Sequence, residues 1–188
     1  MKIRDIYGEL PTLTTDRLLL RKFTVADAED MFEYASEPVV SRFVPWESHN
    51  TIEDTYEFLN FIHKQYQEGK IAPWAIEFKQ TKKVIGTIDF VAWSPIHSTA
   101  EIGFILSKDH WGKGIILEAA TEVIEFGFNK MKLNRIEAPC MVENIQSQRV
   151  LQKMGMRLEG VSRAKYFIKG KYRDMAMYSV LRGEHLRN

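Results

Sequence analysis

The sequence of 188 residues contains a single cysteine, Cys140, and no uninterrupted apolar run longer than four residues. One cysteine excludes an intramolecular disulfide framework and a cysteine cluster for zinc, and the five histidines lack metal-ligand spacing. A bilayer span needs about 20 apolar residues, and the first residues lack the apolar stretch of a secretory signal. A formal net charge of +1 argues against a protein that binds a phosphate backbone. We therefore expect one cytoplasmic domain, residues 1–188, without metal, membrane or nucleic acid.

Helical spacing of apolar residues occurs in four segments. Thr24 and Asp27 have the spacing of a capping box and begin a helix that Pro38 stops. A second helix begins near Thr51 and ends near Gly69, with one apolar face made of Ile52, Tyr56, Leu59, Ile62 and Tyr66. Residues 115–130 and 144–155 predict a long and a short helix.

Short β-branched or aromatic runs separated by polar turns predict seven strands. They lie at residues 17–21, 74–78, 84–91, 100–106 and 135–141, with two more between 158 and 181. The strand–helix–strand unit from 100 to 141 implies one parallel connection inside an otherwise antiparallel sheet. The pattern therefore predicts a mixed sheet of the α/β or α+β class.

A glycine-containing turn, Trp111-Gly112-Lys113-Gly114, lies between a predicted strand and the long helix. Such a turn presents unpaired backbone amides and the positive end of the helix dipole to one point, so it favours an anion such as a pyrophosphate. It is not a nucleoside-triphosphate loop, because Ser107 stands where that loop needs its first glycine. It is not a dinucleotide loop either, because Leu117 replaces the third glycine. A purely structural turn would have the same sequence.

Asn144 and Ser147 open the short helix directly after a strand, where both are also good capping residues. Together with the first turn, two helix starts are thus expected at the ends of neighbouring strands. A cleft between them could hold an extended ligand that carries phosphate.

Five motifs in register resemble the ribosomal-protein (RimJ/RimL-type) branch of the GNAT superfamily of N-acetyltransferases. They are Thr15-Asp16-Arg17-Leu18-Leu19-Leu20-Arg21, Ala100-Glu101-Ile102-Gly103-Phe104, His110-Trp111-Gly112-Lys113-Gly114-Ile115, Asn144-x-x-Ser147-x-x-Val150-Leu151-x-Lys153-x-Gly155-Met156 and Leu158-Glu159-Gly160. The resemblance covers about residues 12–182. It implies the GNAT fold, a mixed, mostly antiparallel sheet of about seven strands and four helices, with a V-shaped splay between the family's fourth and fifth strands.

The resemblance implies that acetyl-CoA lies in this splay. The backbone of Phe104, Ile105 and Leu106 would pair with pantetheine, as an added strand does. The loop residues Trp111, Gly112, Lys113, Gly114, Ile115 and Ile116 would surround the pyrophosphate and hold it by amides from Gly112 onward. Asn144 would contact the pantetheine arm, and Ser147 would lie near the thiol. Trp111 is usual in this branch, whereas Ile116 is bulkier than the family's Gly or Ala and would narrow the wall.

Attack of an amine on a thioester needs a neutral amine, an oxyanion donor and a proton for the thiolate. Backbone N–H groups of the splayed strand could donate hydrogen bonds to the oxyanion. Glu101 is the predicted base, because strand alternation puts it on the face of Gly103; a substrate clamp or a strand-end charge is the alternative. Leu151 replaces the tyrosine that many relatives use as the acid, so Ser147, Tyr166 or water would supply the proton. Lys165 stands near a position where some relatives carry a glutamate.

The acceptor side is predicted to involve the first two helices and their connection. Trp46 and Trp93 could form the floor of an acceptor groove, although Trp46 could equally be a core residue. The basic hairpin around 165–173 is expected to be a solvated tip, and Cys140 a buried apolar residue.

The predicted activity is acetyl transfer from acetyl-CoA to a primary amine. A protein N-terminal α-amine, such as that of a ribosomal protein, is the leading acceptor. The alternatives are a small-molecule amine (polyamine, amino acid or drug) and a silent CoA-binding module. The resemblance also allows a homodimer.

Overall fold

The structure, a computed structural model, describes residues 1–185 and contains one sheet of eight strands in the order β1-β2-β3-β4-β5-β6-β8-β7; residues 186–188 of the predicted domain lie outside the described part. The strands are β1 (Leu13–Thr14), β2 (Leu18–Arg21), β3 (Trp74–Phe78), β4 (Lys83–Ser94), β5 (Thr99–Leu106), β6 (Arg135–Met141), β7 (Arg157–Ile168) and β8 (Lys171–Leu181). The helices are α1 (Ile3–Tyr7), α2 (Ala28–Ala35), α3 (Pro38–Ser41), α4 (Ile52–Glu68), α5 (Ile115–Asn129), α6 (Ile145–Lys153) and α7 (Arg182–His185). Single 3₁₀ turns lie at Val25–Asp27 and Lys108–His110.

The seven predicted strands and four predicted helices are all present. The additional strand β1 has two residues, and the additional helices α1, α3 and α7 have four or five. Elements this short contain too few repeats of the apolar pattern for periodicity to detect them. Pro38 does not simply end a helix, because α2 ends at Ala35 and Pro38 occupies the first turn of α3.

Helix ends follow the local signals in the sequence. The predicted capping box forms at Thr24 with Asp27, another joins Thr51 to Asp54, and Gly69 ends α4 in the left-handed conformation at φ +63°. The predicted apolar face of α4 needs one correction. Tyr56 is 41% exposed, because the buried stripe passes through Thr55, Leu59 and Ile62 instead.

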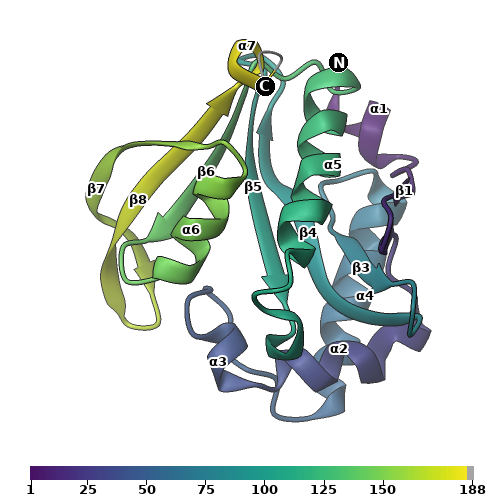
Figure 1. Cartoon of the computed structure of the whole chain (residues 1–188). Helices are drawn as coiled ribbons and strands as arrows, with labels where there is room; N and C mark the ends of the chain where they lie inside the picture. Colours follow the sequence, from purple (N-terminus) through teal and green to yellow (C-terminus); the bar gives the residue numbers. More distant parts are fainter. Residues whose placement is uncertain (186–188) are drawn as a thin grey trace.

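Helices cover both faces of the sheet (Figure 1). On one face lies α5, whose Gly127 has no room for a side chain beside Phe90 of β4 and Ile136 of β6. On the other face lie α2 and α4, and Asp30 of α2 accepts a hydrogen bond from the Val84 amide at 2.9 Å. The core is therefore two layers separated by the sheet. Within residues 1–185, no helix is long and apolar enough to cross a membrane.

The sheet opens into a fork between β5 and β6. These two strands are parallel and pair only from Thr99 opposite Arg135 to Glu101 opposite Glu137. Beyond Glu101 the strands separate, so β5 remains paired with β4, and β6 remains paired with β8 along its whole length. Figure 1 shows the two strands close together at the top and apart below. This fork is the expected V-shaped splay.

Candidate active site

A loop with free backbone amides joins the open end of β5 to α5. Gly112 and Gly114 both have φ +73°, in the left-handed region where glycine is favoured. Among the described residues, the N–H groups of 112–116 form no backbone hydrogen bond, and the first bond of the helix runs from the Glu118 amide to the Gly114 carbonyl at 3.0 Å. Several donors and the positive end of the α5 dipole thus meet at one exposed loop, which suits an anion.

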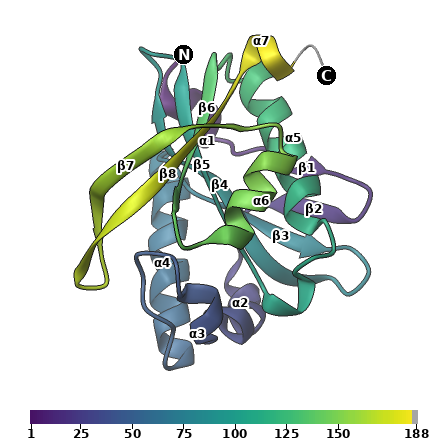
Figure 2. The ribbon, with the colours of Figure 1, turned by 60° about the vertical axis from the view of Figure 1, so that its left-hand side comes forward.

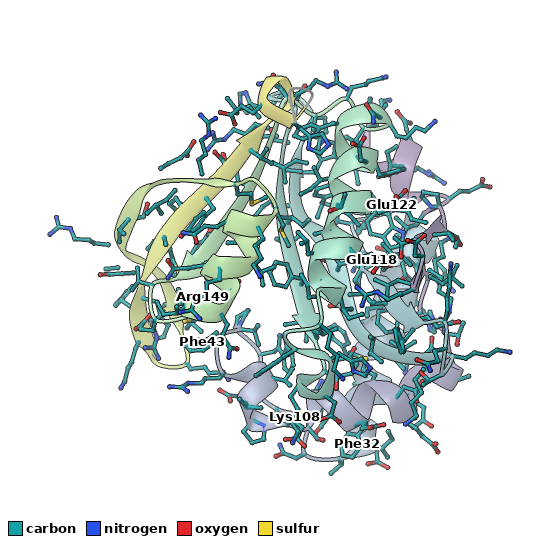
Figure 3. The ribbon with its side chains drawn as sticks, in the orientation of Figure 1. Phe32, Phe43, Lys108, Glu118, Glu122 and Arg149 are labelled. Carbon is teal, nitrogen blue, oxygen red and sulfur yellow. The ribbon has the colours of Figure 1, made fainter. Side chains whose placement is uncertain are left out.

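Arg17, from the turn before β2, braces this loop. Its guanidinium donates to the Lys113 carbonyl at 3.0 Å and pairs with Glu118 of α5 at 2.6 Å. Partial burial opposes ionisation of Glu118, but hydrogen bonds from Thr15 and Arg17 keep the pKa of its carboxyl below the usual value. Figure 3 shows Lys108 and Glu118 on either side of the loop. The sequence contained no local signal for this contact, because Arg17 and Lys113 are 96 residues apart.

The fork itself exposes the middle of β5. Phe104 and Ile105 lie in a central strand yet are only partly buried, because β6 has turned away from them. Leu106 is buried, and its carbonyl accepts a hydrogen bond from the Trp111 indole at 2.8 Å, so Trp111 fixes the strand end to the loop. The side chains of Ile115 and Ile116 are in the core, 2% and 7% exposed, so these residues present their backbone to the loop. Ile116 therefore does not project across the loop.

The helix start on the other side of the fork has the expected geometry. Asn144 is the N-cap of α6, and its side-chain oxygen accepts a hydrogen bond from the Ser147 amide at 3.1 Å. Ser147 lies in the first turn of the helix and is partly buried. Asn144 still has its side-chain NH₂ group available for a ligand in the fork. The two helix starts thus flank the open part of the sheet.

Three carboxylates lie across neighbouring strands on the sheet face that α2 and α4 cover. Asp89 of β4 is opposite Gly103, and Glu101 of β5 is opposite Glu137 of β6. Strand alternation puts Glu101 and Gly103 on the same face, so the Asp89 side chain is there too. We refer to Asp89, Glu101 and Glu137 as the acid row. It lies where the fork begins to open.

Two members of the acid row, Asp89 and Glu101, have raised pKa values. Burial and the neighbouring Glu101 charge raise the pKa of Asp89 to about 7. Burial and Glu137 also raise the pKa of Glu101, whereas Lys165 of β7 lowers it. Glu137 pairs with Arg135 at 2.5 Å. The sequence analysis selected Glu101 and missed Asp89, because the two become neighbours only through the pairing of β4 with β5.

The sequence is similar to known acetyltransferases over most of its length. The acetyltransferase (GNAT) domain family matches residues 17–157. An uncharacterized N-acetyltransferase of Bacillus subtilis, YoaA, is 37% identical over 92% of this chain and 97% of its own length. A ribosomal-protein-serine acetyltransferase of Escherichia coli is 33% identical over 68% of this chain and 70% of its own. The crystal structure of a GNAT-family acetyltransferase from Bacillus anthracis is 32% identical and superposes with a TM-score of 0.81, covering 91% of this chain and 98% of that one. The chain belongs to the GNAT acetyltransferase family.

GNAT acetyltransferases take their acetyl group from acetyl-CoA, and the geometry of this GNAT enzyme fits that substrate. The free amides of the loop suit the pyrophosphate, and the exposed backbone of β5 suits the pantetheine amides. Family membership assigns transferase activity rather than the alternative of a silent CoA-binding module. The roles of the individual residues in the loop and the fork stay predictions.

Two side chains of the GNAT enzyme were predicted to give the thiolate its proton, and they occupy different places. Ser147 lies at the α6 side of the fork, close to Cys140, which is buried as expected at 5% exposure. Tyr166 of β7 lies near the acid row, where burial and then Glu101 and Glu137 raise the pKa of its phenol. We therefore expect Ser147 to be the nearer of the two to the thiol, and Tyr166 the nearer to the acceptor amine.

Replacing Ser147 by alanine should lower kcat about tenfold with little change in KM for the amine, because protonation of the leaving group contributes in the transition state. Replacing Tyr166 by phenylalanine should mainly raise KM for the amine. Steady-state release of the CoA thiol from each variant measures both constants. The reverse pattern, with kcat lost in Tyr166→Phe alone, would assign proton delivery to Tyr166.

The expectation that Trp93 is exposed and floors an acceptor groove is wrong. Trp93 is 8% exposed, packs against Tyr7 with ring centroids 6.4 Å apart, and lies opposite Ala100. Since Ala100 precedes Glu101 in β5, Trp93 is on the other face of the sheet from the acid row. Trp46 is partly buried with its ring 5.7 Å from that of His49, and it stays a predicted acceptor residue.

The basic hairpin of β7 and β8 is not simply a solvated tip. Lys169 donates to the Ser41 carbonyl at 2.8 Å and lies 3.4 Å from Glu47. Phe43 packs with Tyr166 against a small cluster of Met141, Ile168 and Met175. The hairpin thus contacts the end of α3 and the segment that follows it, and Figure 2 shows the tip of the hairpin to the left of that segment. These contacts join the hairpin to the segment that was predicted to bind the acceptor.

Proposed function

We propose that this GNAT enzyme acetylates the N-terminal α-amine of a protein, such as a ribosomal protein. The observation that carries the proposal is the mixed charge around the acid row. Lys165 acts on Glu101, and Arg135 pairs with Glu137. One ammonium group fits between these charges, whereas a polyamine would bring further positive charges against the cationic side chains.

The chemistry also favours an α-amine. An unperturbed α-amine has a pKa of about 7.7–8.0, whereas an alkylamine such as a lysine side chain has about 10.4. The nucleophile must be neutral, so at pH 7–8 an α-amine loses its proton at much lower cost. Its lone pair then attacks the thioester carbonyl carbon, backbone N–H groups of the open β5 stabilise the oxyanion, the C–S bond breaks, and the thiolate takes up a proton.

A polyamine is the second candidate acceptor, and one observation favours it. A cavity of about 370 Å³ near the start of α4 is lined by seven residues, three of them carboxylates. They are Glu47, Ser48, His49, Asn50, Asp54, Glu57 and Phe58. Clustered carboxylates beside an aromatic ring are the chemistry that binds a flexible polycation.

A comparison of three acceptors under one assay separates the candidates. The first is a short peptide with a free N-terminal serine or alanine, the second is the same peptide blocked at its N-terminus and carrying one lysine, and the third is spermidine. We expect kcat/KM for the free peptide to exceed that for the other two by at least about 100-fold, as release of the CoA thiol would show. Preference for spermidine would replace the proposal by the polyamine alternative.

Two further expectations from the sequence stay predictions. They are a homodimer and a location in the cytoplasm. Neither enters the argument for the acceptor.

A further inference from the structure

Asp89 lies next to the point where the fork between β5 and β6 begins to open. Its partner in β5 is Gly103. Gly103 lies two residues beyond Glu101, which is the last residue of β5 that pairs with β6. The Asp89 oxygen Oδ1 lies 3.6 Å from the point that a Cβ on Gly103 would occupy. The carboxylate therefore lies over β5 at Gly103, just beyond the last residue of β5 that pairs with β6. Glu101 lies nearer the closed end.

A bulge in β4 produces this placement. The pairing of β4 with β5 shifts by one residue between Phe90 and Ala92, so Val91 has no partner in β5. Val91 also crosses above Gly103, because a Cβ there would lie 2.8 Å from the Val91 Cγ1. A side chain larger than hydrogen at position 103 would therefore occupy the space between Asp89 and Val91. The missing side chain of Gly103 makes room for the Val91 side chain and lets the Asp89 carboxylate lie close to the strand.

Within residues 1–185, Asp89 forms no hydrogen bond or ion pair with another side chain, and neither does Glu101. Glu137, by contrast, pairs with Arg135, which also pairs with Glu159. A partly buried carboxylate without a partner is costly, and the sheet offers no structural compensation for it. Such a group is the kind that active sites retain for proton transfer.

We propose that Asp89 accepts the proton that the acceptor ammonium must lose, and that Glu101 acts through Asp89 as a positioning residue. In this step an N–H bond of the ammonium breaks, its electron pair stays on nitrogen, and the proton moves to a carboxylate oxygen of Asp89. The neutral amine then forms the C–N bond while the C–S bond breaks. The second amine proton leaves with the thiolate, so the products are the acetamide, CoA thiol and a protonated Asp89 that returns its proton to water.

The charges that face Asp89 come from several elements. The Glu101 charge from β5 raises the proton affinity of Asp89. Asp89 itself acts on the phenols of Tyr7 in α1 and Tyr66 in α4, both of which have raised pKa values, mainly through burial. Glu137 and Lys165 act on Glu101 with opposite signs. A base near neutrality is well suited to take a proton from an α-ammonium at pH 7–8.

The test is the pH dependence of kcat/KM for the best acceptor, measured from pH 5.5 to 9.5 for the wild type, Asp89→Asn, Glu101→Gln and the exposed control Glu29→Gln. Asp89→Asn should lower kcat/KM about 100-fold and abolish the acidic limb, which lies near pH 7 in the wild type. Glu101→Gln should move that limb to lower pH, since it removes the charge that raises the proton affinity of Asp89, and should keep most of the activity at pH 9. Glu29→Gln should match the wild type.

Two results would overturn the assignment. One is an Asp89→Asn enzyme with at least a third of the wild-type kcat/KM and an unchanged limb. The other is loss of the limb in Glu101→Gln, which would make Glu101 the base. CoA affinity, measured by calorimetry, should be unchanged in each variant and serves as the check of folding. If Asp89→Asn does not bind CoA normally, the direction in which Glu101→Gln moves the acidic limb tests the assignment instead. The inference holds for a peptide or a polyamine acceptor, so its failure is distinct from failure of the proposed substrate.

Discussion

Replacing Gly114 by valine is expected to raise the Kd for CoA by at least about 100-fold, or about 2.7 kcal/mol. Gly114 is the N-cap of α5 at φ +73°, a conformation that costs a β-branched residue about 1–3 kcal/mol. If the loop rearranges to relieve this strain, its backbone N–H groups no longer point toward one position where an anion could bind. The new side chain would also stand in exposed space beside Arg17, whose Nη2 lies 3.7 Å from the Cβ position. Isothermal titration with CoA measures the change.

A matched control separates strain from loss of the site. Gly170 also has φ +73°, in the turn between β7 and β8, with no atom within 4 Å of a Cβ. Gly170→Val should therefore cost similar stability in thermal unfolding while leaving CoA affinity within about threefold of the wild type. If the CoA affinity of Gly114→Val is also within about threefold of the wild type, the loop at 112–116 is not the pyrophosphate site, and the predicted pose of acetyl-CoA must be abandoned.

Asp89→Asn is expected to make the folded protein more stable at pH 8 than the wild type, by up to about 4 kcal/mol. The pKa of Asp89 is about 7 in the folded protein, above the 3.8 of a free carboxyl. Between these values the folded state binds more protons than the unfolded state, so the wild type loses stability as pH rises from about 4 to 7. Asparagine resembles the neutral carboxyl at every pH and does not incur this loss.

Chemical denaturation of both proteins at a series of pH values tests this expectation. The free energies of unfolding should be similar near pH 4 and should diverge up to about pH 8. Carboxyl groups far from Asp89 titrate equally in both proteins, so the difference reports on Asp89 and on Glu101, which is coupled to it. A difference that does not change with pH would mean that Asp89 ionises as an ordinary carboxyl in the folded state.

Together with the activity profiles, the second prediction would show a conflict between stability and function at one residue. The substitution that stabilises the fold is the one that removes the proposed proton acceptor. Such a conflict is typical of groups that a site keeps in an unfavourable environment. A purely structural Asp89 would show the opposite behaviour, because its replacement would destabilise the protein.

The elements predicted well from the sequence depend on neighbours within a few positions. The capping box at Thr24 forms because it joins residues three apart, whatever the rest of the chain does. The loop from Gly112 to Gly114 was predicted for the same reason, since glycine allows its positive φ values locally. The parallel connection between β5 and β6 followed from the strand–helix–strand order alone.

The sequence by itself thus determined the order of the principal elements, the loop at the start of α5 and the family. Only the tertiary structure placed Arg17 on that loop, buried Trp93 on the far face of the sheet and brought Asp89 beside Glu101. The positions of Trp93 and Asp89 depend on strand register, and the bulge at Val91 shifts that register by one residue. A one-residue shift changes which side chains are neighbours across the strands, and no local pattern in the sequence encodes it.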